Sequence, residues 1–465
     1  MSAEPASFKF SRRGILRAGA LGVAGITLAD VLRLEAAAGI RSSHKAVINV
    51  HLDGGPPQMD LIDPKPDAPR EQRGEFESIS TNVPGIHLTE LMPQMAKAAD
   101  KFVFLRSLVG AAGRHDAFQC QSGFSFKDLS GIGGRPAMGC VVSQLQGQPT
   151  DAMPAFVDLM QGRPLARNSA RPGFLGPAYR PFRPDLSHLF KRQLEPGMQS
   201  ELARLGNNHT LQLELTEGLT VGRLEGRMSL AKDFDLLRRN VDRSGSMEAL
   251  DKFSQQALGI LTSGRVARAL DLESEDRRVL DRFSPRMKRV DPTHYTTEGP
   301  GAARKFLLAR RMVEAGARCV SISLSDFDTH RSNAERMRFL GPLMDHSLAA
   351  LVSDLEERGM LDDVMIIAWG EFGRTPKVND KGGRDHWPRV AMGIMAGGGI
   401  RGGQVIGSTD KYASEATSSP VHYQDVIATL YQHLGIDARN VTLTDTTGRP
   451  QYLVDIGAPI ARLFA

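Results

Sequence analysis

The chain is poor in cysteine and holds no long apolar run beyond residues 18–29. Its three cysteines among 465 residues are Cys120, Cys140 and Cys319, too few and too scattered for a disulfide framework or a thiolate zinc site. The sequence also lacks the GxxxxGK loop of nucleotide-binding proteins and the GxSxG elbow of common serine hydrolases. These absences exclude a disulfide-stapled domain, a P-loop enzyme and an ordinary serine hydrolase.

Charge gives little indication of a polyanionic partner. The chain carries a formal net charge of +5, but its basic residues do not gather on one face or stripe, as they do in nucleic-acid binders. We therefore expect no nucleic-acid partner. The remaining composition, 41% hydrophobic and 24% charged, is typical of a globular protein large enough for an extended core.

The N-terminus carries a paired arginine, Arg12-Arg13, followed by a short apolar segment at 18–29 and by the small residues Ala36-Ala37-Ala38. This pattern resembles a twin-arginine export signal, which is an address read by a receptor. The apolar segment is short and rich in Gly and Ala, so we expect no stable membrane span. The alternative is a chance Arg-Arg before an amphipathic helix. We expect export by the twin-arginine translocation machinery and a periplasmic or extracellular location.

Apolar strand-like runs alternate with segments of helical periodicity along most of the chain, which favours an α/β fold with a mostly parallel central sheet. We expect strands at 46–52, 101–105, 155–159, 318–324, 364–369 and 390–396, and helices at 88–99, 138–145, 304–315, 335–357 and 426–434. We divide the chain into an export signal at 1–38, a first part of the core at 39–150, an irregular and helical insertion at 151–300 and a second part of the core at 301–465. The clearest helical pattern of the insertion covers 198–283.

The stretch from Val364 to Pro388 concentrates reactive side chains in a loop after a buried strand. Its first six residues are apolar, and a loop follows with Glu371, Arg374, Asp385 and His386 among several glycines and prolines. Loops at the carboxyl ends of parallel strands are where α/β folds place ligand and metal sites. This loop is therefore our first candidate for a functional site.

Three other expected strands also end in acidic or imidazole groups. Asp53 follows the first strand, and His115 lies at the end of a small-residue loop after the second. Asp328 and His330 follow the strand at 318–324. Taken singly, Asp53 could be a turn residue, His115 a surface histidine, and its neighbour Asp116 a helix cap. In a mostly parallel sheet, however, all these strand ends lie along one edge.

Carboxylates gathered at one edge repel one another, and a bound divalent cation removes that conflict. We therefore expect one or two metal ions rather than a hydrogen-bonded or salt-bridged polar cluster. Asp and neutral His together favour zinc, manganese or iron, whereas calcium is served by oxygen ligands alone.

A set of longer motifs identifies the chain as similar to one bacterial family. The motifs are Asp53-Gly54-Gly55-Pro56, Asp63-Pro64-Lys65-Pro66, Arg106-Ser107-Leu108, Phe174-Leu175-Gly176-Pro177, Asp328-Thr329-His330, Gly370-Glu371-Phe372-Gly373-Arg374-Thr375-Pro376, Gly383-Arg384-Asp385-His386-Trp387-Pro388 and Ala396-Gly397-Gly398-Gly399-Ile400. Together they resemble an exported sulfatase-like family (domain of unknown function 1501) in the alkaline phosphatase-like superfamily. The resemblance covers residues 45–436 and implies a three-layer α/β/α fold.

The resemblance also implies a two-metal centre that hydrolyses phosphate or sulfate esters. It places Asp53 at one metal, Asp328 (or Asp326) with His330 at the other, Glu371 in the position of an Asp-His pair, and His386 as a later ligand. Asp385 would add a ligand or orient His386. His115 would serve catalysis, and Arg374 or Arg114 would bind the ester anion.

The chain departs from the superfamily pattern at three places. Where a Ser, Thr or cysteine-derived nucleophile is expected, it reads Gly113-Arg114-His115-Asp116; Phe372 stands where a His ligand is expected, and Gln58 replaces a His. Ser107, Cys120 and Ser122 lie nearby at the wrong offset. Two functions stay open. One is a metal-dependent hydrolase of sulfate or phosphate esters, with an anionic small molecule or a sulfated polysaccharide as substrate; the other is a non-catalytic metal- or ligand-binding envelope protein.

Overall fold

A computed structural model of the chain describes residues 44–148, 151–160, 170–190 except 185, 187 and 188, 263–287 and 298–464, together with positions 255, 257 and 259. The expected export signal and most of the expected helical insertion lie outside the described residues. No described helix is both long and apolar enough to cross a membrane.

An eight-stranded sheet forms the centre of the fold, in the order β11-β4-β10-β7-β1-β6-β5, with β14 also pairing with β4. Its strands are β1 (Ala46–Leu52), β4 (Phe102–Val109), β5 (Phe156–Asp158), β6 (Cys319–Leu324), β7 (Val364–Trp369), β10 (Ala391–Gly397), β11 (Gln404–Ile406) and β14 (Val421–His422). β10 pairs antiparallel with both of its neighbours, while the other pairings are parallel. The predicted α/β fold with a mostly parallel sheet is confirmed.

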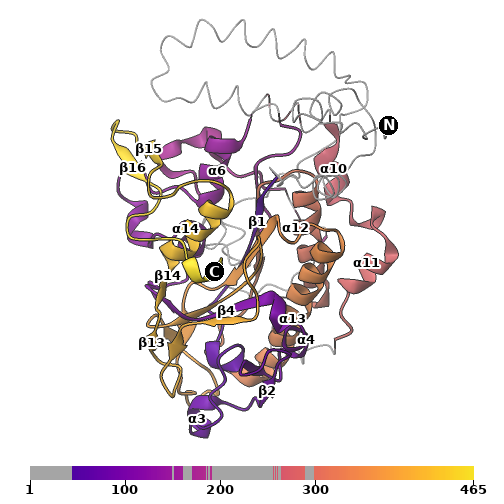
Figure 1. The fold of residues 1–465 in the computed structure, drawn as a ribbon, viewed down its shortest axis with the longest axis vertical. Helices are drawn as coiled ribbons and strands as arrows, with labels where there is room; N and C mark the ends of the chain where they lie inside the picture. The colour runs from indigo at the N-terminus through magenta and orange to yellow at the C-terminus, as the bar shows by residue number, and fades with distance from the viewer. Residues whose placement is uncertain are drawn as a thin grey trace, which may run out of the picture.

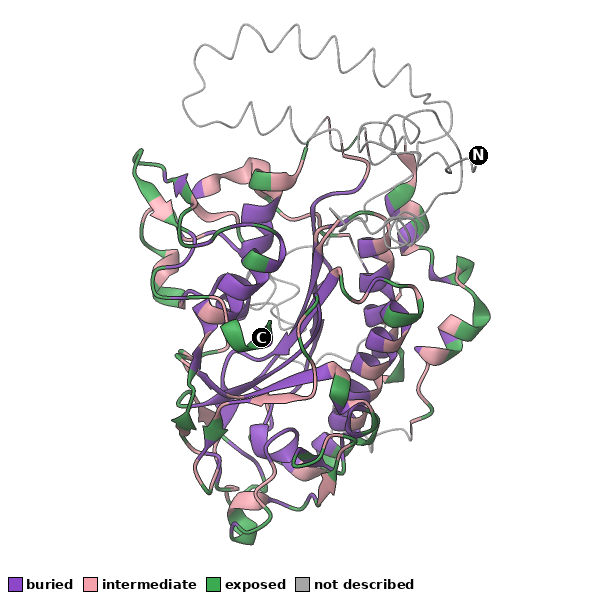
Figure 2. Cartoon of the chain, viewed as in Figure 1, coloured by how far each residue is buried: buried purple, intermediate pink, exposed green. Residues whose placement is uncertain are grey.

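Both faces of the sheet are covered, which explains why its central strands are apolar throughout. In β1, Ile48 and Val50 point into one apolar layer while Val47 points into the other, because successive side chains in a strand face opposite ways. The same alternation in β7 sends Ile366 to the first layer and Ile367 to the second. Figure 2 shows the strands buried between helices whose outer sides are exposed.

The helices form two layers around the sheet (Figure 1). On one face lie α4 (Pro93–Lys97), α12 (Arg304–Glu314) and α13 (Asn333–Glu357), with α10 (Arg265–Leu270) against α12; on the other lie α5 (Phe118–Ser122), α6 (Met138–Gln146) and α14 (Tyr423–His433). Two short helices, α3 (Arg70–Arg73) and α11 (Arg277–Arg282), complete the set among the described residues.

In the described part of the chain, four two-stranded ribbons stand outside the central sheet. They are β2–β3 (Ser78–Ser80 with His87–Thr89), β8–β9 (Gly373–Arg374 with His386–Trp387), β12–β13 (Ser408–Thr409 with Ala416–Ser418) and β15–β16 (Thr442–Thr444 with Pro450–Tyr452). The β8–β9 ribbon follows β7 directly and therefore stands at the carboxyl edge of the sheet.

Some elements differ from their predicted form. The helix expected at 88–99 is replaced by strand β3 and the short helix α4, because the backbone N–H of Thr89 is bonded to Leu61 O and Pro93 begins a new helix. β4 continues to Val109, through residues that we expected to form a loop, because β14 pairs with its last two residues. β5 lies within the expected insertion range and yet pairs with β6, so the sheet extends into that range.

Candidate metal centre

The carboxyl ends of β1, β4, β6 and β7 meet at one edge of the sheet. β1, β6 and β7 are mutually parallel, and β4 runs the same way because it and β7 are both antiparallel to β10. The loops that leave these strands bring Asp53, His115, Asp328 and Glu371 together, along with His330, Asp385 and His386 from neighbouring turns. These are the residues that the sequence singled out.

Four of these side chains form what we call the outer group: His115, Asp328, His330 and His386. Asp328 lies at its centre. Its Oδ1 is 3.1 Å from His330 Nε2 and 3.4 Å from His386 Nε2, and its Oδ2 is 3.3 Å from His115 Nε2. The group reaches the surface, since the His330 side chain is 46% exposed.

Three buried side chains form the inner group: His51, Asp53 and Glu371. His51 Nε2 lies 3.5 Å from Glu371 Oε2 and 3.9 Å from Asp53 Oδ1. His51 was not predicted from the sequence as a site residue, because it stands within an apolar strand and looks like a core residue. The available signal was its spacing, since residues 51 and 53 lie on the same face of an extended segment.

Gly54 allows the loops after β1 and β6 to approach each other. Its φ of +108° suits glycine, and a Cβ there would collide with the backbone nitrogen of Asp328. The backbone N–H of Gly54 donates a hydrogen bond to Glu371 Oε1 at 3.0 Å. The glycine thus connects the inner and outer groups through the backbone.

His115 links the two groups. Its Nδ1 lies 3.1 Å from Glu371 Oε1, and its Nε2 faces Asp328 Oδ2. Burial opposes a charge on the ring, but hydrogen bonds to Asp328 and Glu371 outweigh it and raise the pKa of His115 to about 9. For Asp328, burial is likewise outweighed, by the hydrogen bond from His115 and by the Arg374 charge, so its pKa falls far below its usual range.

Arg374 holds the backbone of the site together. Its guanidinium is fully buried and donates to Gly54 O, to Gly55 O at 3.0 Å, to Arg384 O at 2.9 Å and to Asp328 Oδ1 at 2.6 Å. We expected Arg374 or Arg114 to bind the ester anion. The geometry instead gives Arg374 a positioning role, whereas Arg114 is exposed beside His115, with its guanidinium 4.7 Å from the centre of the Phe126 ring.

The tautomers of His330 and His386 follow from their partners. His330 Nδ1 lies 2.6 Å from Asp385 Oδ1, and His386 Nδ1 lies 3.1 Å from Gly113 O. Both partners are acceptors, so each Nδ1 carries a proton, and in the neutral rings each Nε2 presents a lone pair. Asp385 therefore orients His330, and not His386 as the alternative role proposed for it.

The two Nε2 atoms lie 3.1 Å apart and both face the Asp328 carboxylate. Two lone pairs and an anionic oxygen directed at one point repel, and a cation at that point removes the repulsion. A histidine whose other nitrogen is held by a carboxylate or a carbonyl is the usual arrangement of a metal ligand. The outer group therefore fits a divalent cation.

The inner group fits a cation as well. Three buried atoms of this group, both ring nitrogens of His51 and the Oε2 of Glu371, have no hydrogen-bond partner among the described residues. Buried polar atoms without partners are costly. The ligand atoms within each group lie within 4.8 Å of one another, and ligands bound tetrahedrally at ~2.1 Å lie roughly 3.4 Å apart. Mixed imidazole and carboxylate donors suit zinc, manganese or iron.

Three residues left open by the sequence now have defined surroundings. Asp326 pairs with Arg336 and belongs to neither ligand group, so Asp328 is the aspartate in the outer group. Gln58 is buried and holds the β8 backbone, since its amide bonds both Arg374 O and Arg374 N. Phe372 packs against His386, with ring centres 4.2 Å apart, and against His115 at 5.3 Å.

The hydroxyl and thiol groups near His115 are used within the fold. Ser107 Oγ donates to Ser419 O and Ser122 Oγ donates to Phe118 O. Cys120 is buried, and that burial raises the pKa of its thiol well above the usual value. None of these three is presented to the centre as a nucleophile.

The sequence model of the family described as "Protein of unknown function (DUF1501)" matches residues 44–464. No curated protein sequence matches the chain.

Several solved structures are similar to the chain at low identity. The PsFucS1 sulfatase from Pseudoalteromonas sp. is 15% identical, with a TM-score of 0.37, over 88% of this chain and 71% of its own. The phosphonate monoester hydrolase SpPMH from Silicibacter pomeroyi is 11% identical, with a TM-score of 0.36, over 91% and 77%. The lipoteichoic acid synthase LtaP from Listeria monocytogenes is 8% identical, with a TM-score of 0.32, over 92% and 93%.

Proposed function

Because the chain belongs to the DUF1501 family and gathers two groups of metal-type ligands at one sheet edge, we propose that it is a metal-dependent hydrolase of sulfate or phosphate esters. The observation that carries the proposal is the pair of Nε2 atoms of His330 and His386, 3.1 Å apart and directed at Asp328. Substrates include anionic small molecules, and sulfated polysaccharide is a candidate polymer.

The ligands would divide between the two groups. His330, His386 and Asp328 would hold one ion, and His51, Asp53 and Glu371 a second. Bound divalent cations supply Lewis acidity toward the ester oxygens and offset the charge of the carboxylates.

The remaining residues would bind and position the ester. His115 lies between Asp328 and Glu371 and is 21% exposed, so it can hold a proton for the leaving oxygen. Arg114, next to it and exposed, would bind the ester anion. Arg374 would fix the Gly54–Gly55 turn, and Asp385 would fix the His330 ring.

Metal analysis and turnover test this proposal together. We expect the purified exported protein to contain a transition metal by mass spectrometry, to lose thermal stability in chelator, and to cleave an aryl sulfate or aryl phosphate. His330→Ala and His386→Ala should lose metal and activity, whereas His87→Ala, an exposed histidine of β3, should keep both. The metal centre is ruled out if the protein contains no metal ion and neither His330→Ala nor His386→Ala changes its melting temperature.

A second function is favoured by the use of Ser107 and Ser122 hydroxyls as donors to backbone carbonyls. Without a hydroxyl nucleophile, the same centre can act as a non-catalytic metal- or ligand-binding envelope protein. This alternative is supported if metal is present, no ester is cleaved, and His115→Ala alters neither metal content nor stability.

Export is part of the proposal. The paired arginines Arg12-Arg13 and the small residues 36–38 support a twin-arginine signal. This route carries folded proteins, so the metal would be acquired before translocation to the periplasm or beyond.

A further inference from the structure

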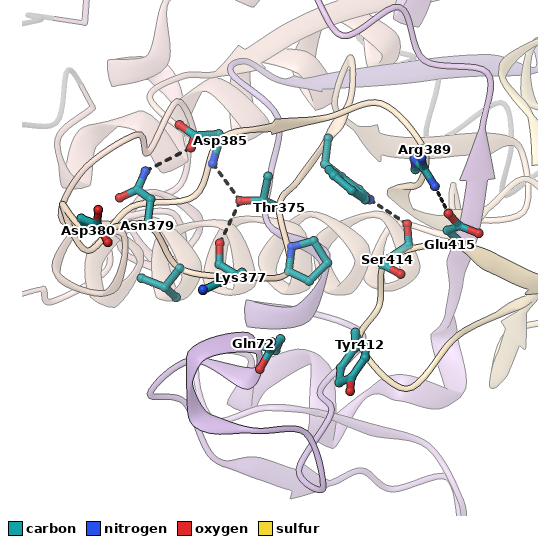
Figure 3. A pocket seen from close by; sticks show the side chains of 13 residues that line it. Gln72, Thr375, Lys377, Asn379, Asp380, Asp385, Arg389, Tyr412, Ser414 and Glu415 are labelled. Carbon is teal, nitrogen blue, oxygen red and sulfur yellow. Dashed lines mark hydrogen bonds and ion pairs between the residues drawn. The ribbon is translucent and has the colours of Figure 1, made fainter.

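A pocket of about 570 Å³ opens beside the outer group, against the β8–β9 ribbon (Figure 3). Three segments far apart in the sequence line it: Gln72 of α3, the loop and ribbon from Thr375 to Arg389, and the turn from Tyr412 to Glu415. Figure 3 shows Gln72 and Tyr412 on one side of the opening and Thr375, Lys377 and Asn379 on the other. The proposed ester chemistry does not use this space.

The pocket and the metal centre share one wall. Asp385 lines the pocket, and its Oδ1 holds His330 while its Oδ2 accepts from Asn379 at 3.3 Å. In β9, successive side chains point to opposite sides, so His386 faces the centre and Trp387 faces the pocket. His330 and Asp385 are both about half exposed, so the outer group and the pocket each open to solvent there. Because Asp385 contacts His330 and also lines the pocket, a substrate whose ester lies at His330 would extend toward the pocket.

Ring side chains and polar groups both line the pocket. The Trp387 ring is fixed by its Nε1, which donates to Ser414 O at 2.6 Å, and Pro376 and Tyr412 add two further ring surfaces. The Gln72 amide and the Thr375 hydroxyl also line it, whereas the Asn379 amide is already bonded within its own loop and to His330 O. Aromatic faces pack on the C–H faces of sugar rings, while amides, carboxylates and hydroxyls exchange hydrogen bonds with sugar hydroxyls.

The charges of the pocket do not favour a polyanion. Its lining contains the cations Lys377 and Arg389 and the anions Asp380, Asp385 and Glu415. Arg389 is also engaged, since it pairs with Glu415 and lies 5.4 Å from the Trp387 ring centre. A sulfate at this position would meet three acidic groups and only two basic ones.

We propose that the pocket binds an uncharged, hydroxyl-rich sugar unit next to the ester-bearing unit of the substrate. The inference rests on the proposed ester hydrolase for its substrate, and it narrows the substrate class to glycans whose ester groups are sparse. Trp387 and Tyr412 provide the stacking surfaces, and Gln72, whose Oε1 has no hydrogen-bond partner among the described residues, binds the hydroxyls.

Tryptophan fluorescence tests the proposal directly, because the chain has only two tryptophans. Trp369 is fully buried and stacked on Tyr423, so changes caused by a ligand report Trp387. We would titrate the full-length exported protein with three uncharged hexasaccharides (from agarose, xylan and cellulose) and with a heparin hexasaccharide. At least one uncharged hexasaccharide should give a saturable change, and Trp387→Phe should abolish it.

Tyr412→Ala should weaken that binding at least tenfold while leaving turnover of a small aryl ester unchanged. Tyr452→Ala, a 55%-exposed tyrosine of the separate β15–β16 ribbon, is the matched control and should bind as wild type. The inference is overturned if no uncharged hexasaccharide saturates, if heparin alone binds, or if Tyr412→Ala binds normally.

The test separates this inference from the proposed function. Sugar binding should persist in chelator and in His330→Ala. Sugar binding without any ester turnover therefore refutes the proposed hydrolase activity and supports the proposed sugar site. Ester turnover without sugar binding refutes the pocket alone.

Discussion

His330 and His386 approach each other through their Nε2 atoms only because Asp385 and Gly113 O hold the opposite ring nitrogens. Each ring is therefore oriented by a group that never reaches the centre. Asp385 is 52% exposed, so it can be replaced with little effect on the core.

Asp385→Ala should weaken metal binding roughly 10–100-fold, because His330 loses the partner that fixes its tautomer and angle. Competition against a fluorescent chelator measures the change in dissociation constant. Asp380→Ala, in the same loop and exposed, should bind metal as wild type. Equal affinity in the two variants would mean that Asp385 does not orient His330.

His433 gives the fold a pH dependence that is independent of the metal centre. Burial lowers the pKa of His433 to about 4, and its Nε2 faces Ala46 O and Asp363 O at 3.1 Å. The folded state keeps the ring neutral, while the unfolded chain protonates it near its ordinary pKa of about 6.5. This contribution to stability is complete above about pH 6.5 and is lost as the pH falls toward 4.

Urea unfolding of wild type and His433→Asn at pH 7 and pH 5 tests whether His433 makes the protein less stable as the pH falls. Wild type should lose more free energy of unfolding between the two pH values than the variant does. The full contribution corresponds to about 3 kcal/mol across the whole titration. A variant with the same pH dependence as wild type would contradict this origin.

Among the elements, α12, α13 and the turn before α11 are joined by a buried ionic network. Arg310 of α12 is 1% exposed, with Nη2 2.6 Å from Glu275 and Nε 2.8 Å from Asp354 of α13. Arg311 and Arg358 also reach Glu275. Buried charges of this kind are stable only while their partners remain.

Arg310→Ala should lower the free energy of unfolding by about 3–5 kcal/mol, because Glu275 and Asp354 both lose their nearest and most deeply buried cation. Arg277→Ala is the control, since the Arg277–Asp281 pair of α11 is exposed at both ends and should cost less than about 1 kcal/mol. Thermal or urea unfolding compares them. Similar losses in both variants would show that the network contributes no more than a surface pair.

Element prediction succeeded where a residue's surroundings are uniform. The strands at 46–52 and 364–369 were predicted at their observed bounds because both faces of each are buried, so every position is apolar. The pattern at 88–99 failed because a tertiary bond at Thr89 and the proline at 93 override its helical spacing. The antiparallel direction of β10 could not be predicted from the sequence, since a buried strand has the same apolar pattern whether it runs parallel or antiparallel to its neighbours.

Site residues could likewise be predicted only where the strand pattern indicated them. Asp53, Asp328 and Glu371 could be found because each stands just after an apolar run, at an edge that a parallel sheet brings together. His51 could not, because it lies inside such a run. The orienting role of Asp385 and the buried carbonyl partners of Arg374 depend on loop paths that no periodicity encodes.

At the scale of the whole molecule, helices cover both faces of the sheet (Figures 1 and 2), and the centre lies at the carboxyl ends of its parallel strands. A chain that folds and binds metal before export needs a route that accepts folded cargo. The paired arginines are the part of the sequence that would select that route.

Replacing Arg12 and Arg13 together by lysine should block export, and the precursor should accumulate in the cytoplasm. Immunoblots of cytoplasmic and periplasmic fractions measure the shift. The matched control is replacement of Lys9 by arginine, which keeps the charge outside the pair and should export normally. Normal export of the double-lysine protein would refute the twin-arginine assignment.

The β8–β9 ribbon has only two residues in each strand, Gly373 with Trp387 and Arg374 with His386. Moving the pairing by one residue would turn His386 to the pocket and Trp387 to the metal centre. Insertions or deletions of a single residue within β9 should therefore be selected against. The metal centre and the pocket therefore depend on the same strand pairing. A change in glycan preference would have to come from substitutions around Trp387, because a change in the length of β9 would also displace His386.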